Sequence, residues 1–528
     1  MRHLIISREY PPSPYSAGGI GTYVDHIARL LAGRGETVHV IAQMWPGASR
    51  AREERQDGRL IIHRVPLDEP LPARPPTDLD ILQTLSDSVL PAQAFMWQAA
   101  LLAESLVETE GIDVIDTQEY EAPTYTLMLR RTLGVATGRL VPIIVQLHSP
   151  SELVFAYNEW NQDRVDYVPL KRAEAHVIRA ADALVCPSRY LARMIESHYR
   201  LEPASIAVIP YPVENAAVLP RERGIWEQGT ICYVGRLEPR KGVLEWIEAA
   251  VAVARDAAAA KFTLIGADTP RWGTGKESTR DVLLARIPPP LRSRFTFIDA
   301  VPRPELAAYL SQARIAVVPS RWENFPFTCI EAMLSGLPVL VSPTGGMAEM
   351  VEDGRTGWIA AGPDVQSLHD ALRRALATPA HLLADMGAAA AVAIRVLCDS
   401  RETVSRHLAF RRQIVAHGCR AAPGLANVPV GGTGAPRLET VRDICAAFPR
   451  LAACSADDLA VLPHMSLQQQ RADHPLTERP SQGERSLTLV EIARASRTQQ
   501  IAIVRRALSN PRYILQWLAW HTRRALRR

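Results

Sequence analysis

Short apolar runs that alternate with helix-length segments constrain the fold of this chain more than any other feature. A first series of strand-like runs lies near His3, Val38, Leu60, Asp113, Val141 and Leu184. A second series extends from Thr230 to Ile359. Because parallel strands need long crossover connections, this spacing predicts parallel sheets with helices between their strands. A chain of 528 residues is also too long for a single core. We therefore expect two Rossmann-like α/β halves and an additional piece.

Two glutamates, Glu323 and Glu331, stand between a predicted buried strand at 315–320 and a predicted helix that begins at Thr328. Glu323 is expected in the connecting loop and Glu331 in the first helical turn. Both would then lie at the carboxyl edge of the second sheet. Ligands of open α/β sheets bind at this edge, beside helix N-termini whose N–H groups suit phosphate or sugar oxygens. A structural interpretation stays open, since Thr328 and Glu331 also fit a capping box.

A basic loop bounded by glycines, Gly235 to Gly242, follows the strand predicted at 230–234 and precedes a helix predicted at 245–260. It carries Arg236 and Lys241 to the same sheet edge. A guanidinium and an ammonium at this place can neutralise a diphosphate. Isolated surface cations are commonly just solvated, so the loop needs its context. Further glycines in 344–357 permit either a close approach of backbone to a ligand or tight turns.

Taken in order, these segments resemble the retaining glycosyltransferases of glycosyltransferase family 4, also called group 1, which have the GT-B fold. The resemblance covers residues 1–418 and is carried by Gly-Arg-Leu-Glu-Pro-Arg-Lys-Gly, by Glu-x7-Glu and by the glycine-rich segment 345–357. It implies two Rossmann-like domains that face each other across a cleft. It also implies transfer of a sugar, with retained anomeric configuration, from a nucleoside diphosphate donor to a saccharide, lipid-linked or small-molecule acceptor. Two alternatives stay open, an acceptor-free nucleotide-sugar enzyme such as a 2-epimerase and a non-catalytic nucleotide-sugar-binding protein.

The resemblance assigns roles to individual residues. Arg236 and Lys241 correspond to the diphosphate clamp, Glu323 to the carboxylate that faces the donor sugar, and Glu331 to the ribose-binding carboxylate. His148 ends the strand predicted at 141–148, where the family places a histidine near the donor sugar, and it joins the catalytic set. The remaining donor-binding residues that the resemblance implies are Gly18, Gly19, Asn324, Phe325, Pro326, Phe327 and Thr328. One departure is the segment 209–213, where relatives often carry Asn-Gly after the first proline and this chain has Tyr-Pro.

Cofactors and several partner classes are not expected. No Asp-x-Asp motif stands at a strand end and the basic clamp can replace a divalent ion, so we predict no metal and no cofactor. The formal charge of +4 is small, and no basic-aromatic stripe precedes the Gly/Pro-rich segment, which argues against nucleic acid. Seven scattered cysteines without zinc or redox spacing indicate a reducing cytoplasm. The sequence shows no signal peptide and no run of about 18 apolar residues, so no membrane span is expected.

Domain organisation follows from these patterns and from the resemblance. We expect an N-terminal Rossmann-like acceptor-side domain at 1–215 and a C-terminal Rossmann-like nucleotide-sugar-binding domain at 216–395. A helix at 396–420 is expected to cross back to the N-terminal domain. A Gly/Pro-rich linker at 421–437 and a mainly helical extension at 438–528 would follow.

The end of that extension, 512–528, combines Trp517 and Trp520 with several arginines. A basic helix with interfacial aromatics can lie on an anionic membrane surface. This would place a cytoplasmic protein at the inner face of the membrane. A helix packed on the catalytic domains with solvated arginines is the alternative.

Overall fold

The computed structural model describes residues 1–13, 19–48, 50–71, 78–90, 92–132, 136, 138–162, 164, 166–214, 217–257, 259–269 and 278–419. The predictions for Gly18, the linker at 421–437, the helical extension at 438–528 and its basic end at 512–528 lie outside these residues. Below, the N-terminal half denotes the described residues up to 214, and the C-terminal half those from 217 to 397. Both halves belong to one compact unit that ends at Ala421.

The N-terminal half contains an eight-stranded sheet among its described residues, with the order β3-β4-β2-β1-β5-β6-β7-β8. All neighbours pair in parallel except β3 and β4, which are antiparallel. Strands β2 to β4 are added on one side of β1, and strands β5 to β8 follow on its other side. The pair β1 and β5 is therefore the topological switch point. The strands are β1 (Arg2–Ile6), β2 (Thr37–Gln43), β3 (Arg52–Arg55), β4 (Leu60–Val65), β5 (Val114–Gln118), β6 (Ile143–Gln146), β7 (Ala183–Cys186) and β8 (Ile206–Val208).

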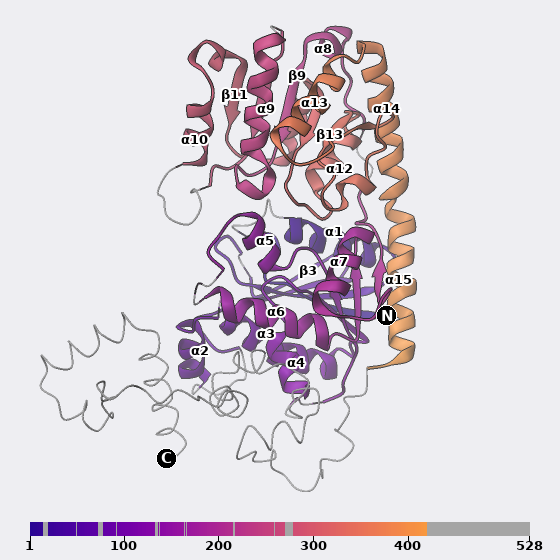
Figure 1. The fold of residues 1–528 in the computed structure, drawn as a ribbon. Coiled ribbons are helices and arrows are strands. Elements are labelled where there is room, and N and C mark those ends of the chain that lie inside the picture. The colour runs from indigo at the N-terminus through magenta and orange to yellow at the C-terminus, as the bar shows by residue number, and fades with distance from the viewer. Residues whose placement is uncertain are drawn as a thin grey trace, which may run out of the picture. The chain divides into compact units, whose positions relative to one another are not determined.

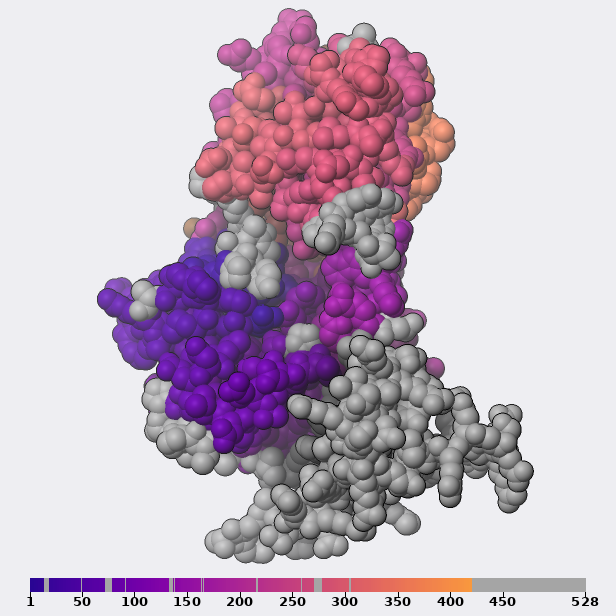
Figure 2. All heavy atoms as spheres, turned by 90° about the vertical axis from the view of Figure 1, so that its left-hand side faces the viewer, coloured from indigo at the N-terminus to yellow at the C-terminus, as the bar shows by residue number. Residues whose placement is uncertain are grey.

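The described part of the C-terminal half contains a six-stranded, fully parallel sheet with the order β11-β10-β9-β12-β13-β14. Its switch point lies between β9 and β12, the strands that precede the basic loop and Glu323. The strands are β9 (Thr230–Val234), β10 (Phe262–Ile265), β11 (Phe295–Ile298), β12 (Ala313–Val318), β13 (Val339–Val341) and β14 (Gly357–Ile359). Figures 1 and 2 show this half in magenta to orange-pink and the N-terminal half in indigo to purple.

Helices connect the strands of each sheet, as the alternating pattern predicts (Figure 1). In the N-terminal half they are α1 (Gly19–Gly33), α2 (Asp78–Ser86), α3 (Gln93–Thr109), α4 (Tyr125–Thr132), α5 (Ser151–Tyr157), α6 (Tyr167–Ala180) and α7 (Arg189–Tyr199). In the C-terminal half they are α8 (Arg223–Gln228), α9 (Val243–Asp256), α10 (Thr279–Arg286), α11 (Arg303–Ser311), α12 (Phe327–Leu334), α13 (Val365–Leu376) and α14 (Ala380–Leu397), with 3-10 turns η1 (Pro239–Lys241), η2 (Pro289–Arg294) and η3 (Gly346–Glu349). The last described helix is α15 (Ser400–His417).

Both faces of the C-terminal sheet are buried, which explains why its strands are continuously apolar rather than alternating. In β12, Ile315 and Val317 belong to the core that includes Trp246 of α9. Ala316 and Val318 point to the other face and join the core that includes Ile330 of α12. Helices on the two sides therefore hold β12 and fix the position of the loop that follows it.

Helices α14 and α15 lead the chain from the C-terminal half back to the N-terminal half. Gly387 of α14 lies against the backbone of Gly336, where an added Cβ would approach the carbonyl oxygen to 2.1 Å. On α15, the buried Arg411 donates to Asp116 of β5, with 2.9 Å between Nη2 and Oδ1. By length and composition α14 is apolar enough to cross a membrane, which differs from the expectation of no such segment, but Leu383, Met386 and Ile394 are buried in the cores.

Candidate active site

The basic loop after β9 folds against the end of β12. Gly242 has a φ of 65°, and a Cβ at this position would lie 2.0 Å from the carbonyl oxygen of Pro319. Only glycine fits such a left-handed position in direct contact with neighbouring backbone. The preceding 3-10 turn η1 consequently presents Arg240 and Lys241 to the loop that carries Glu323.

Glu323 is a buried carboxylate held by two cations. Its Oε1 accepts hydrogen bonds from Nη1 of Arg240 and from Nζ of Lys241, and only 8% of the residue is exposed. Burial opposes ionisation of this carboxyl, but the charges of Arg240 and Lys241 outweigh it and lower the pKa of Glu323 to about 2. The carboxylate is therefore charged at physiological pH. Neither cation binds Oε2, so that oxygen stays available to a ligand.

A second carboxylate, Glu238, completes the network. It accepts from Nη2 of the buried Arg240 at 2.8 Å and from Nη2 of Arg236 at 3.3 Å. Burial disfavours its charged form, yet Arg240 and Arg236 lower the pKa of Glu238 below its ordinary value. Arg236, Arg240 and Lys241 thus outnumber the two carboxylates by one positive charge. Because the Arg236 side chain is 57% exposed, this residue is the cation best placed to meet a diphosphate.

His148 lies at the carboxyl end of β6 in a buried position. Its backbone N–H donates to both oxygens of Glu119, at 2.7 and 2.9 Å, and its Nδ1 is 2.6 Å from the Tyr211 hydroxyl. Nε2 has no hydrogen-bond partner among the described residues. Burial lowers the pKa of His148 to about 3, so the imidazole is neutral near pH 7. A neutral imidazole with one unpaired nitrogen can hydrogen-bond to a sugar hydroxyl, but it does not carry a proton to donate as an acid near pH 7.

Asn324 connects the loop after β12 to the N-terminal half. Its Nδ2 donates to the carbonyl oxygen of His148 at 2.9 Å, and its Oδ1 accepts from Ser188 Oγ at 2.7 Å. Glu349 makes a second connection, because its carboxylate accepts the N–H groups of Arg189 and Tyr190 at the start of α7. Glu323 and His148, which are distant in sequence, are thereby brought to one region of the molecule.

Aromatic and glycine residues pack around this region. Tyr211 stacks on Phe327 with 5.4 Å between ring centroids and meets Phe325 edge-on at 5.5 Å. Gly19 at the start of α1 lies beside Phe327, since an added Cβ would be 3.9 Å from that ring. The departure from the family noted at 209–213 therefore places Tyr211 in contact with His148.

The glycines at 345 and 346 approach the protein's own backbone. A Cβ on Gly345 would lie 1.8 Å from the carbonyl oxygen of Glu323, and Gly346 N–H donates to that oxygen at 3.0 Å. Gly345 also has a φ of 85°, which favours glycine. Of the two interpretations for this segment, close approach to a ligand or a tight turn, these contacts favour a tight turn that packs against the Glu323 loop.

Helix α12 begins at Phe327, one residue earlier than predicted, with Pro326 as its N-cap. No side chain caps this end, so the capping box that had stayed open as the structural interpretation of Thr328 and Glu331 does not form. With Pro326 at the N-cap, Thr328 is the second residue of the helix and cannot itself be the cap. Glu331 consequently lies in the second turn, not the first.

Several residues that contact Glu323, Arg240 or His148 were not predicted from the sequence. Arg240 is adjacent to Lys241, so its position in the basic loop was a usable signal. Asn158 follows α5, and its Oδ1 accepts the Arg240 N–H at 3.0 Å. Glu119 and Tyr211 both contact His148. Nothing in the local sequence marks Asn158 for this contact, because the two segments meet only in the folded chain.

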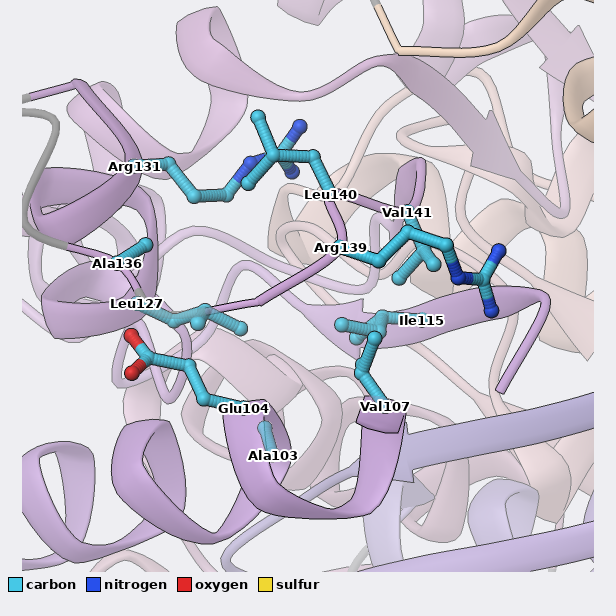
Figure 3. Close-up of a pocket in the computed structure, with 10 residues that line it drawn as sticks. All are labelled: Ala103, Glu104, Val107, Ile115, Leu127, Arg131, Ala136, Arg139, Leu140 and Val141. Carbon is cyan, nitrogen blue, oxygen red and sulfur yellow. The ribbon is translucent and has the colours of Figure 1, made fainter. Parts of the chain in front are cut away.

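Two cavities in the described part of the chain lie away from the predicted site. One of about 20 Å³, enough for a water molecule, lies between α3, α4, β5 and the segment before β6 (Figure 3). A pocket of about 260 Å³ lies at α1 and the start of α15, and is lined by Arg29, Leu30, Gly33, Arg34, Gln56, Glu214, Ser400, Arg401 and Val404. Neither includes a residue of the predicted site. The described residues also contain no group of three or more His, Cys, Asp or Glu side chains that could hold a metal.

Two protein families match consecutive parts of the chain. Residues 17–216 match "Glycosyltransferase Family 4", and residues 220–392 match "Glycosyl transferases group 1". Among curated relatives, D-inositol 3-phosphate glycosyltransferase of Geodermatophilus obscurus is 27% identical over 443 residues, 81% of this chain and 92% of the relative. Glycogen synthase of Mycobacterium tuberculosis is 26% identical over 388 residues, 72% of this chain and 87% of the relative.

Solved structures show the same fold at lower sequence identity. Sucrose-phosphate synthase from Thermosynechococcus elongatus aligns with a TM-score of 0.61 at 21% identity, covering 79% of this chain and 100% of that one. HepE from Anabaena in complex with UDP and glucose aligns with a TM-score of 0.55 at 15% identity, covering 78% and 100%. The catalytic domain of starch synthase IV from Arabidopsis thaliana, bound to ADP and acarbose, aligns with a TM-score of 0.56 at 15% identity, covering 79% and 99%.

Proposed function

We propose that this chain, which belongs to the GT-B glycosyltransferases of group 1 and family 4, transfers a sugar from a nucleoside diphosphate donor with retention of anomeric configuration. One observation carries the proposal. At the switch point of the C-terminal sheet, Glu323 is held by Lys241 and Arg240, while Arg236 is half-exposed beside them. The bound UDP of HepE and the bound ADP of starch synthase IV support a nucleoside diphosphate as the donor class.

In the proposed reaction, the cations act on charge that develops at the leaving group. As the bond between the anomeric carbon and the donor oxygen breaks, the β-phosphate gains negative charge. Arg236, Lys241 and the N-terminus of α12, which no side chain caps, would stabilise that charge. Glu323 keeps Lys241 in place and offers Oε2 to a donor-sugar hydroxyl.

Stabilisation by donor candidates tests the donor assignment. Purified protein would be heated with UDP-, GDP- and ADP-sugars, and binding of the correct donor should raise Tm selectively. Transfer is then followed by NMR of the product, where an α-linked donor should give an α-linked product. An epimerised donor without an acceptor would favour a 2-epimerase, and binding without turnover would favour a non-catalytic protein.

Metal independence is part of the proposal, because the clamp supplies the positive charge that a divalent ion would otherwise provide. We expect chelation with EDTA to leave the transfer rate unchanged. A control enzyme that requires magnesium should lose activity in the same buffer. Activity that is lost with EDTA and restored by magnesium or manganese would contradict this prediction.

Glu331→Gln separates ribose binding from a structural role. Hydrogen bonds to charged groups are stronger than neutral ones by about 1 kcal/mol, so donor Kd should rise roughly five- to tenfold. Tm should hardly change, because the substitution keeps the shape of the side chain. Calorimetric titration with the donor measures the effect, with Glu305→Gln on the exposed side of α11 as the matched control. Unchanged donor affinity would remove Glu331 from the site.

We place the enzyme in the cytoplasm, and membrane attachment through 512–528 stays a prediction about residues outside the described part of the chain. Full-length protein should float with anionic vesicles, and a truncation after Asn510 should not. Each arginine near an anionic surface contributes about 1 kcal/mol, so high salt should release the protein. Equal partitioning of both proteins would favour a soluble acceptor over a lipid-linked one.

A further inference from the structure

Tyr211, which follows β8, is packed between aromatic rings from both halves of the molecule. Its buried ring stacks on Phe327 of α12, with the ring planes 10° apart and 5.4 Å between centroids. Tyr23 of α1 and Phe325 also lie against it, at centroid distances of 4.8 and 5.5 Å. These contacts fix the direction of the phenol group, and its hydroxyl meets Nδ1 of His148 at 2.6 Å.

The Tyr211 hydroxyl is the donor in this hydrogen bond. A phenol has one O–H to donate, and a neutral imidazole has one N–H and one acceptor nitrogen. Among the described residues, Nδ1 of His148 is the one hydrogen-bond partner of the Tyr211 oxygen. A proton on Nδ1 would donate to the phenol oxygen and leave the buried O–H without an acceptor, which is costly. With Nδ1 as the acceptor, the phenol O–H is satisfied.

Both groups are neutral near pH 7. Burial raises the pKa of Tyr211 well above its ordinary value, so the phenol keeps its proton. Burial also lowers the pKa of His148 to about 3, so the imidazole carries a single proton. Because Nδ1 accepts from the phenol, that proton is on Nε2.

Nε2 of His148 is the ring atom that the protein leaves without a partner. It is buried and makes no hydrogen bond to any described residue. Tyr23 meets the imidazole edge-on, with 5.1 Å between centroids, but its hydroxyl donates to Gln146 at 2.9 Å. The backbone of His148 is already bonded to Glu119 and Asn324. Buried N–H groups without an acceptor are rare in folded proteins, and a ligand oxygen would supply the acceptor that Nε2 lacks.

We propose that Tyr211 is a positioning residue whose hydroxyl keeps the His148 proton on Nε2, so that His148 donates a hydrogen bond to a hydroxyl oxygen of the donor sugar. The inference rests on the proposed glycosyl transfer. It gives a direction to the contact between His148 and the sugar, and a role to the position where this chain departs from its family. Since consecutive hydrogen bonds polarise one another, the Tyr211 hydroxyl also strengthens the bond that Nε2 makes.

Nitrogen-15 NMR of the imidazole tests the tautomer without any ligand. The spectrum of histidine-labelled protein is compared with that of His148→Gln, which lacks the His148 signals. We expect wild-type His148 to have a protonated Nε2 and an unprotonated, hydrogen-bonded Nδ1. In Tyr211→Phe, which keeps the stacked ring, the Nδ1 signal should move to higher frequency because its hydrogen bond is lost. A proton on Nδ1 in the wild type, or an unmoved Nδ1 signal in the variant, would overturn the proposal.

Tyr199→Phe is the matched control for the loss of a buried hydroxyl. Tyr199 ends α7 and donates its hydroxyl to Glu152, away from the imidazole. Its replacement should leave the His148 signals where they are in the wild type. Movement of the Nδ1 signal in this control as well would show that the change in Tyr211→Phe is not specific, and would likewise count against the proposal.

Deoxy analogues of the donor test the hydrogen bond to the sugar. With the donor identified by thermal shift, calorimetry gives Kd for the donor and for analogues that each lack one sugar hydroxyl. One analogue should bind the wild type and Tyr199→Phe about fivefold more weakly than the donor does. In Tyr211→Phe and His148→Gln this penalty should shrink to about twofold or less. No penalty in the wild type, or an undiminished one in Tyr211→Phe, would refute the inference. If no nucleotide sugar shifts Tm, the proposed glycosyl transfer fails, and the NMR result still decides the role of Tyr211.

Discussion

Replacing Glu323 with glutamine should both destabilise the fold and abolish most turnover. The substitution leaves the partly buried Lys241 without its counter-charge and removes one of two carboxylates from the buried Arg240. Breaking a buried ion pair by removing one partner costs about 3–5 kcal/mol. Chemical denaturation should show this loss, and donor turnover should fall by at least two orders of magnitude because Lys241 is no longer held toward the donor.

The pH dependence of stability gives an independent test of the same carboxylate. Its pKa in the folded protein, about 2, lies below the ordinary value of 4.5. The ion pairs therefore stabilise the folded state fully above pH 4.5, and this contribution is lost as the pH falls toward 2. The lost stability amounts to about 3 kcal/mol. In Glu323→Gln this part of the acid destabilisation should be absent, and an unchanged acid profile would contradict the assignment. The exposed Glu352→Gln is the matched control.

Local patterns predicted the elements that place the site. The strand predicted at 230–234 coincides with β9, and the predicted strand and helix around Glu323 correspond to β12 and α12 with shifts of one or two residues. These predictions succeed because strands buried on both faces leave a continuous apolar run and helices leave a periodic one. The family resemblance then supplied residue roles that spacing alone does not contain.

Contacts between distant segments could not be predicted from the sequence. The bond from Asn324 to the carbonyl oxygen of His148 joins residues whose loops meet only when the two halves fold together. The pairing of Glu323 with Arg240, as well as with Lys241, depends on the turn η1, which directs both side chains to one carboxylate. The capping box does not form for a local reason, because the helix begins at Phe327 and Thr328 therefore lies inside its first turn.

Alanine at Arg236 or at Lys241 should reduce turnover by about two to three orders of magnitude. Removing one preorganised partner of a developing negative charge typically costs about 2.7–4 kcal/mol of transition-state stabilisation. The two variants should differ in stability. The Arg236 side chain is 57% exposed, so its loss should leave Tm close to that of the wild type. Lys241 is partly buried against Glu323, and its loss leaves that buried carboxylate with Arg240 alone, so Tm should fall.

Steady-state kinetics with the identified donor, together with thermal unfolding, separates these effects. Arg355→Ala, an exposed arginine of the same half whose Nη1 donates to Glu352 in the turn before β14, should behave as the wild type in both measurements. If the clamp acts on the leaving group, kcat should fall for Arg236→Ala without a comparable loss of donor affinity, because the charge it meets is largest in the transition state. A donor with a better leaving group, such as a sugar fluoride, needs less charge stabilisation, so the activity lost in either variant should be partly restored with it. Near-normal kcat in both variants would show that the basic loop after β9 is structural and that the diphosphate is bound elsewhere.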